Sequence, residues 1–267
     1  MQPRVLILRA PGTNCDQETA FAFTTAGGRP DVLHLNRVLE APQLLGDYQI
    51  LCLPGGFSYG DDLSAGRIFG AQIRHHLDHA LREFKAAGKL ILGICNGFQI
   101  LLKSGILLPD KVTANQGSEP TATLTNNESG MFEDRWVHLN VSSEKCPFLV
   151  GIQQMYLPVA HAEGRFVARD GAALIGLESA GQLCLRYAAA PQAHVPTAKN
   201  SPVSYPANPN GAQLHVAGVC DETGRVLGLM PHPERHLDPT HHPRWTRETH
   251  DRGDGLALFE NAVRYFA

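Results

Sequence analysis

A continuous apolar segment runs directly into the sequence Gly-Ile-Cys-Asn-Gly, and this junction limits the folds open to the chain. Leu90 to Ile94 has the length and composition of a strand that is covered on both faces of a sheet. The residues that follow form a helical pattern that ends near Gly105. Glycines on either side permit a sharp turn between strand and helix, with Cys95 at its tip. The junction therefore predicts a nucleophile elbow, in which the helix N-terminus favours a Cys95 thiolate.

The chain up to about residue 110 alternates between strand and helix patterns. A helix is expected to begin at Asn14 or Asp16, and a longer one to run from Arg67 to Ala87 with one buried apolar stripe. Strands are predicted at Val5 to Leu8, Val32 to Leu35 and Ile50 to Leu53. This rhythm predicts an α/β fold with an open, mostly parallel sheet and helices on both faces.

Beyond Pro109 the pattern loosens into shorter pieces. An irregular loop is expected from Ala188 to Gly211, and an amphipathic helix from Asp254 to Phe266 closes the chain. Strands are predicted at Trp136 to Val141, Arg165 to Ala168, Gln213 to Val219 and Val226 to Met230. No repeat and no domain boundary is visible, so we expect residues 1–267 to form a single domain.

Composition excludes several classes of partner. The formal net charge is −3, which argues against nucleic acid or an anionic membrane as the main partner. No apolar run approaches the ~20 residues that span a bilayer. Six cysteines are scattered without framework spacing and no export signal is visible, so we expect reduced thiols in a cytoplasmic protein.

A candidate base lies near the other end, in the sequence Met-Pro-His-Pro-Glu-Arg. Pro233 favours an extended backbone, in which His232 and Glu234 point to the same side. A carboxylate beside an imidazole fixes its tautomer and stabilises its protonated form. By itself this pattern fits a rigid loop with solvated polar residues better than it fits a catalytic pair. The late strand, however, delivers the pair to the sheet edge of Cys95, which makes these residues a candidate Cys-His-Glu triad.

The glycine-rich loop after the third strand, Leu53 to Asp61, is a candidate oxyanion site. Gly55 and Gly56 let the backbone approach a ligand and expose N–H groups. A P-loop would end in Lys-Ser or Lys-Thr, which this loop lacks, so we reject a nucleotide site here. The Asn96 N–H faces the expected oxyanion, and Gln99, one helical turn after Cys95, is placed to hydrogen-bond a substrate.

These motifs, in this order, resemble the class I (triad) glutamine amidotransferases, nearly from end to end. In their detailed sequence the motifs are similar to one branch of this family, the glutaminase component of phosphoribosylformylglycinamidine synthase. The passages that carry this likeness are Gly12 to Asp16, Gly55 to Asp62, Gly93 to Gln99, Asn208 to Gly211 and Met230 to Arg235.

The resemblance implies a flavodoxin-like glutaminase with Cys95 as nucleophile, His232 as base and Glu234 as its orienter. The residues around the oxyanion and glutamine would be Gly55, Gly56, Phe57, Asn96 and Gln99. The implied partner is a large synthetase subunit that uses ATP and Mg to convert formylglycinamide ribonucleotide into formylglycinamidine ribonucleotide in purine biosynthesis. A small accessory subunit is left open as a further partner. No metal or organic cofactor is expected in this chain.

The chain departs from the family pattern in two places. Ala162 stands in the loop His161 to Arg165 where the pattern has glycine, and residues 188–204 look like a surface insertion. Cys15 lies near a helix start with no histidine nearby in sequence, so we expect it to be structural or near an interface. His75 and His79 lack the spacing of the His-Glu-x-x-His zinc motif and are expected on a solvated face.

Three alternatives remain at this point. The chain could be a class I glutaminase of another synthetase, a stand-alone cysteine hydrolase on the same fold, or a catalytically inactive scaffold. The sequence Phe-Ser-Tyr-Gly-Asp disfavours a glutaminase of another synthetase. The intact Cys95, His232 and Glu234 disfavour an inactive scaffold.

Overall fold

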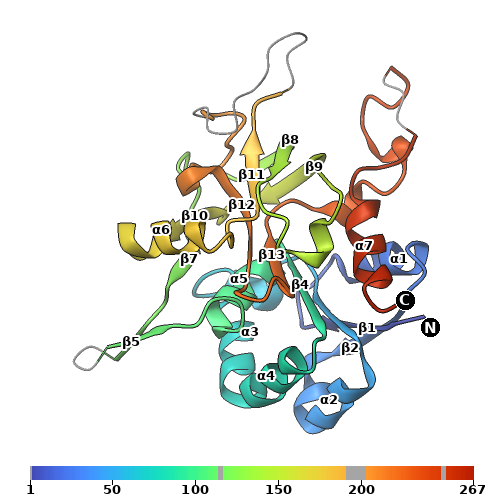
Figure 1. The fold of residues 1–267 in the computed structure, drawn as a ribbon, viewed down its shortest axis with the longest axis vertical. Coiled ribbons are helices and arrows are strands. Elements are labelled where there is room, and N and C mark those ends of the chain that lie inside the picture. The colour runs from blue at the N-terminus through green and yellow to red at the C-terminus, as the bar shows by residue number, and fades with distance from the viewer. Residues whose placement is uncertain (1, 114–116, 191–202, 248–250) are drawn as a thin grey trace.

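The computed structural model describes residues 2–113, 117–190, 203–247 and 251–267, and these are built around one nine-stranded sheet (Figure 1). The strand order is β2-β1-β3-β4-β13-β12-β11-β8-β9. The first five strands in this order run parallel, and are β2 (Arg29–His34), β1 (Arg4–Arg9), β3 (Ile50–Leu53), β4 (Leu90–Ile94) and β13 (Val226–Leu229). The others are antiparallel, and are β12 (Val216–Cys220), β11 (Leu185–Ala188), β8 (Glu133–Val141) and β9 (Gln154–His161).

Helices cover the parallel part of the sheet from both sides. Figure 1 shows α1 (Asp16–Thr25) and α7 (Leu256–Arg264) together on one side, and α3 (Arg67–Gln72) and α5 (Asn96–Ser104) on the other. The rings of Phe23 and Phe259 join the first pair edge to face, with centroids 5.0 Å apart. The predicted flavodoxin-like α/β class is therefore confirmed, with an antiparallel extension.

Smaller elements complete the described chain. The remaining helices are α2 (Leu35–Glu40), α4 (Asp78–Ala86) and α6 (Gly171–Ser179). Two short two-stranded sheets pair β7 (Ala122–Thr125) with β10 (Arg165–Ala168), and β5 (Lys111–Thr113) with β6 (Gly117–Glu119). No helix of the described residues is long and apolar enough to cross a membrane.

The predicted helix from Arg67 to Ala87 is divided in three. A wide π-helical turn at Ile73–Leu77 separates α3 from α4. The predicted stripe is confirmed, since four of its five members are buried and Ala80 is partly buried; the four are Phe69, Ile73, Leu77 and Phe84. Burial of this stripe therefore continues through the irregular turn.

The sequence prediction missed β9, although it forms the longest ladder in the sheet with β8. Pro158 interrupts its strand pattern, because proline cannot donate to a ladder. β9 is the edge strand of the sheet, where a missing donor is tolerated. The predicted insertion at 188–204 lies mostly outside the described residues, although Ala188 is the last residue of β11.

We predict that Gly228→Ala destabilises the fold. Gly228 lies in β13, where an added Cβ would stand 2.1 Å from Cδ2 of the Phe98 ring in α5. Overpacking of this kind costs about 1–3 kcal/mol in the free energy of unfolding, measurable by urea denaturation. The matched control is Gly176→Ala in α6, where no atom lies within 4 Å of the added Cβ. That change should stabilise by about 0.5–1 kcal/mol, and equal stability of both variants would contradict the packing argument.

Candidate active site

Cys95 stands at the turn between β4 and α5, as the elbow prediction requires. Its backbone angles are φ 51° and ψ −105°, and its side chain is almost fully buried. The turn depends on two close approaches. A Cβ on Gly97 would stand 1.9 Å from the Leu53 carbonyl oxygen, and one on Gly93 would stand 2.6 Å from the Gly97 oxygen. Glycine at both positions is therefore a steric requirement of the elbow.

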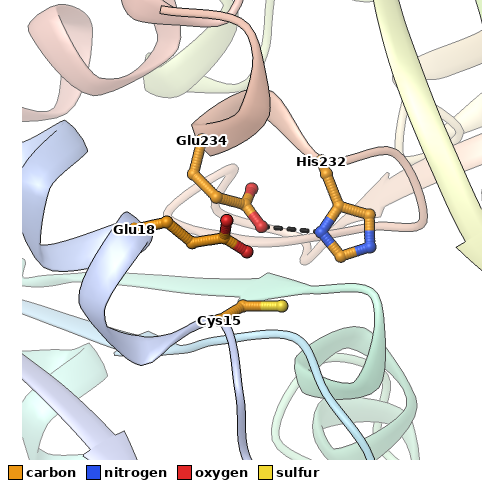
Figure 2. A group of neighbouring side chains, drawn as sticks. All are labelled: Cys15, Glu18, His232 and Glu234. Carbon is orange, nitrogen blue, oxygen red and sulfur yellow. Dashed lines mark hydrogen bonds and ion pairs between the residues drawn. The ribbon is translucent and has the colours of Figure 1, made fainter. Parts of the chain in front are cut away.

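His232 and Glu234 follow β13 and form a buried pair. The His232 Nδ1 and the Glu234 Oε1 are 2.6 Å apart, and both side chains are almost completely buried (Figure 2). Burial alone would lower the pKa of His232, but the charges of Glu234 and Cys95 raise it well above its usual value. Because Glu234 occupies Nδ1, the Nε2 atom of the ring is left for proton exchange with a nucleophile.

Gly55 marks the point where the candidate residues meet. A Cβ at this position would stand 2.8 Å from Cε1 of His232 and 3.5 Å from the Cβ of Cys95. The structure thus brings the elbow, the histidine and the glycine-rich loop together at the carboxyl edge of the parallel strands. Their catalytic roles remain predictions, but the proximity that those roles require is present.

The glycine-rich loop is held by the segment that follows β1. Phe57 donates its N–H to the Gly12 oxygen at 2.9 Å, and Tyr59 donates to the Pro11 oxygen at 2.7 Å. Gly56 has φ 135°, which side-chain-bearing residues rarely adopt. The Phe57 N–H is therefore already engaged, and reaching an oxyanion would require the peptide to turn.

Asn96 fastens the same loop from the other side. Its Oδ1 accepts from the Ser58 hydroxyl at 2.6 Å, and its Nδ2 donates to Asp61 at 3.1 Å. The same Nδ2 donates to Gln99 Oε1 at 2.9 Å, and Gln99 in turn donates to the Glu163 carbonyl at 2.6 Å. Gln99 therefore ties α5 to the loop after β9, and its predicted contact with glutamine stays a prediction.

A cavity of about 520 Å³ opens beside this network. Its lining includes Asp61, Lys103 and Glu163, which carry charges of both signs. Burial, followed by the charge of Glu163, raises the pKa of Asp61 to about 6. The lining of the cavity therefore carries both acidic and basic groups.

Cys15 has no histidine nearby in sequence, but the structure places His232 beside it. A Cβ on Gly55 would stand 3.1 Å from the Cys15 Sγ as well as 2.8 Å from the His232 ring. Burial raises the pKa of the Cys15 thiol to about 11, although His232 and Arg235 oppose this shift. Sequence distance concealed the contact, because Cys15 precedes α1 and His232 follows β13.

β9 ends in a buried histidine, His161, to which the sequence analysis assigned no chemistry, and a loop follows it. His161 Nδ1 lies 3.1 Å from Asn127 Oδ1, and burial, with the charge of His232, lowers the His161 pKa to about 3. Ala162 in this loop is exposed and has no positive φ, so the departure from glycine causes no strain. His75 and His79 are exposed on their helix, as predicted.

Comparison with known families matches nearly the whole chain. The sequence model for the CobB/CobQ-like glutamine amidotransferase domain matches residues 2–266. The chain belongs to the glutamine amidotransferases. The candidate elbow, histidine–carboxylate pair and glycine-rich loop all lie within the matched residues.

Similar proteins narrow the branch within this family. Phosphoribosylformylglycinamidine synthase subunit PurQ from Dehalococcoides mccartyi is 44% identical over 98% of this chain and 97% of its own length. The protein of the same name from Methanococcus maripaludis is 38% identical, over 100% of this chain and 99% of its own. A solved structure of PurLQS from Thermotoga maritima superposes with a TM-score of 0.71 at 31% identity, covering both chains completely.

We predict that a diazo-ketone analogue of glutamine labels Cys95 and spares Cys15. Both thiols lie near His232, but the raised pKa of Cys15 keeps it protonated and weakly nucleophilic at neutral pH. Peptide mapping by mass spectrometry locates the label, with a Cys95→Ala variant as control. A label on Cys15 in the unmodified chain would contradict the assignment of the nucleophile.

We also predict that His232→Ala lowers the glutaminase rate more than Glu234→Gln does. The imidazole moves the proton, whereas the carboxylate orients it, although loss of an orienter can still cost ~10⁴-fold in a serine protease. Because the Glu234 charge raises the pKa of His232, Glu234→Gln should also move the histidine limb of the pH–rate profile to lower pH. Single-turnover rates across pH test both points, and a wild-type rate and profile in Glu234→Gln would refute the role of the carboxylate.

Proposed function

We propose that this chain is the glutaminase subunit of phosphoribosylformylglycinamidine synthase. It hydrolyses glutamine and delivers ammonia to a synthetase that converts formylglycinamide ribonucleotide into formylglycinamidine ribonucleotide in purine biosynthesis. The observation that carries the proposal is the convergence of Cys95, the His232–Glu234 pair and Gly55 at one sheet edge. The full-length likeness to subunits of that synthase supports the choice of branch.

The chemistry follows from the two sides of the His232 ring. With Nδ1 held by Glu234, Nε2 takes the Cys95 proton, and the thiolate attacks the side-chain amide of glutamine. Backbone N–H groups of the Gly55–Phe57 loop and of Asn96 stabilise the oxyanion. His232 then protonates the departing ammonia and activates the water that hydrolyses the thioester to glutamate. These steps use no metal or organic cofactor in this chain.

We infer that the cavity lined by Asp61, Lys103 and Glu163 recognises the amino-acid end of glutamine. Its Asp61 and Glu163 carboxylates suit the substrate ammonium, and Lys103 suits the substrate carboxylate. This charge pattern favours free glutamine as the substrate.

Because the Phe57 N–H is bonded to Gly12, a docked synthetase could control the glutaminase activity by releasing it. At neutral pH most free ammonia is protonated and not nucleophilic, so uncoupled hydrolysis would waste glutamine. Turning the peptide between Gly56 and Phe57 breaks its bond to Gly12 and frees a donor for the oxyanion. Docking of the large synthetase, which holds the ATP and Mg, favours the turned state. We place this assembly in the cytoplasm, where six free thiols persist.

Steady-state glutamate release tests this proposal. We expect weak activity in the isolated chain and strong stimulation by the purified synthetase with ATP and formylglycinamide ribonucleotide. Cys95→Ala is the control, since the assembled variant should lose glutamine-dependent synthesis but keep synthesis from added ammonium salts. Full activity of the isolated chain, unchanged by the synthetase, would indicate a stand-alone hydrolase instead.

A further inference from the structure

Four side chains that can each offer a metal ligand meet on the side of His232 nearest α1. They are Cys15, Glu18, His232 and Glu234, and their ligand atoms all lie within 4.8 Å of one another (Figure 2). No other group of this kind occurs among the residues that the structure describes. Thiolate, imidazole and carboxylate are the ligand types of four-coordinate zinc sites. We propose that this group binds Zn²⁺ and that the bound ion inhibits the glutaminase.

The ligands come from two short segments whose backbones are already fixed. Cys15 immediately precedes α1 and Glu18 lies in its first turn, whereas His232 and Glu234 flank the rigid Pro233. Zinc takes sulfur, nitrogen and oxygen ligands at about 2.0–2.3 Å, so the side chains contract around the ion by rotation. Gly55 keeps the space between Cys15 and His232 free of a side chain, because its Cβ would stand 3.1 Å from Cys15 Sγ.

Arg235 is the cation that occupies this group in the metal-free protein. Its Nη2 donates to Cys15 Sγ at 3.2 Å, and its Nε donates to Glu18 Oε1 at 3.0 Å. Cys15, His232 and Glu234 are buried, but the side chains of Arg235 and Glu18 are 34% and 35% exposed. The guanidinium can therefore swing into solvent and leave an entry path for the ion. Metal binding and Arg235 compete for the same ligands.

A zinc ion here would stop the proposed proton transfer without touching Cys95. It takes the place of the proton on His232 Nδ1, and Glu234 turns from hydrogen-bonding this atom to ligating the ion. The remaining ring proton then resides on Nε2, which can no longer accept the proton of the nucleophile. The ion therefore inhibits the enzyme by holding His232 in the tautomer that cannot act as a base. It is not a cofactor of the reaction.

Cobalt binding tests the site independently of activity. Co²⁺ replaces Zn²⁺ in tetrahedral sites, and a thiolate ligand gives a charge-transfer absorption band. The assembled enzyme should show this band, and the Cys95→Ala enzyme should retain it. Cys15→Ser should abolish it, whereas Cys220→Ser, which changes another free thiol, should leave it intact.

Inhibition by buffered free Zn²⁺ provides the second measurement, with each variant compared with its own zinc-free rate. Cys15→Ser and Glu18→Gln should raise the half-inhibitory concentration by at least the 10–100-fold that loss of even an outer-shell partner costs. Arg235→Ala, which removes the competing cation, should lower it.

Several outcomes overturn the proposal. They are a band that persists in Cys15→Ser, a band that is lost in Cys95→Ala, and unchanged zinc inhibition in Cys15→Ser. The second outcome would place the ion on the Cys95–His232 pair instead. Because the cobalt band is read without substrate, failure of the zinc site and failure of the glutaminase assignment remain distinguishable.

Discussion

Cys95 has a backbone conformation that costs of order 1–3 kcal/mol, and the surrounding sheet has to hold it there. Strands β3 and β4 stabilise this conformation. The Leu53 oxygen of β3 lies so close to the Gly97 backbone that no side chain fits at residue 97. β13 lies next to β4 and ends beside this turn, so the same ladder that strains Cys95 also delivers His232. Loss of register between these strands would therefore separate nucleophile and base together.

Charged neighbours keep the pKa of the buried base, His232, above its usual value. Desolvation lowers the pKa of His232, but the charges of Glu234, whose Oε1 lies 2.6 Å from Nδ1, and of Cys95, with the side-chain contacts of Cys15 and Cys95, together more than offset it. His161 shows the opposite result in the same neighbourhood, because its partner Asn127 carries no charge and burial lowers its pKa to about 3. His232 therefore has negatively charged neighbours that favour its protonated form, whereas His161 has the charge of His232 nearby, which disfavours protonation.

The glycine-rich loop is fastened from two sides, and this matters for control by a partner. The segment after β1 holds its backbone through Gly12, while Asn96 in α5 holds Ser58 and Asp61. The Asn96 contacts thus hold the loop beside the nucleophile independently of the Gly12 contact. The passages Gly12 to Asp16 and Gly55 to Asp62, which carried the family resemblance, are the two halves of this contact.

The sequence by itself determined the α/β class, the elbow at Cys95, the candidate base pair and the branch of the family. Local chemistry suffices for the first three, because a strand pattern, flanking glycines and a proline between His232 and Glu234 act over a few residues. The branch followed from the resemblance of several passages to a known family. Tertiary structure decided what depends on residues distant in the chain. It placed Cys15 beside His232, turned the Phe57 N–H toward Gly12 and made β9 an edge strand despite Pro158. Each of these follows from packing between separate elements, which no local pattern encodes.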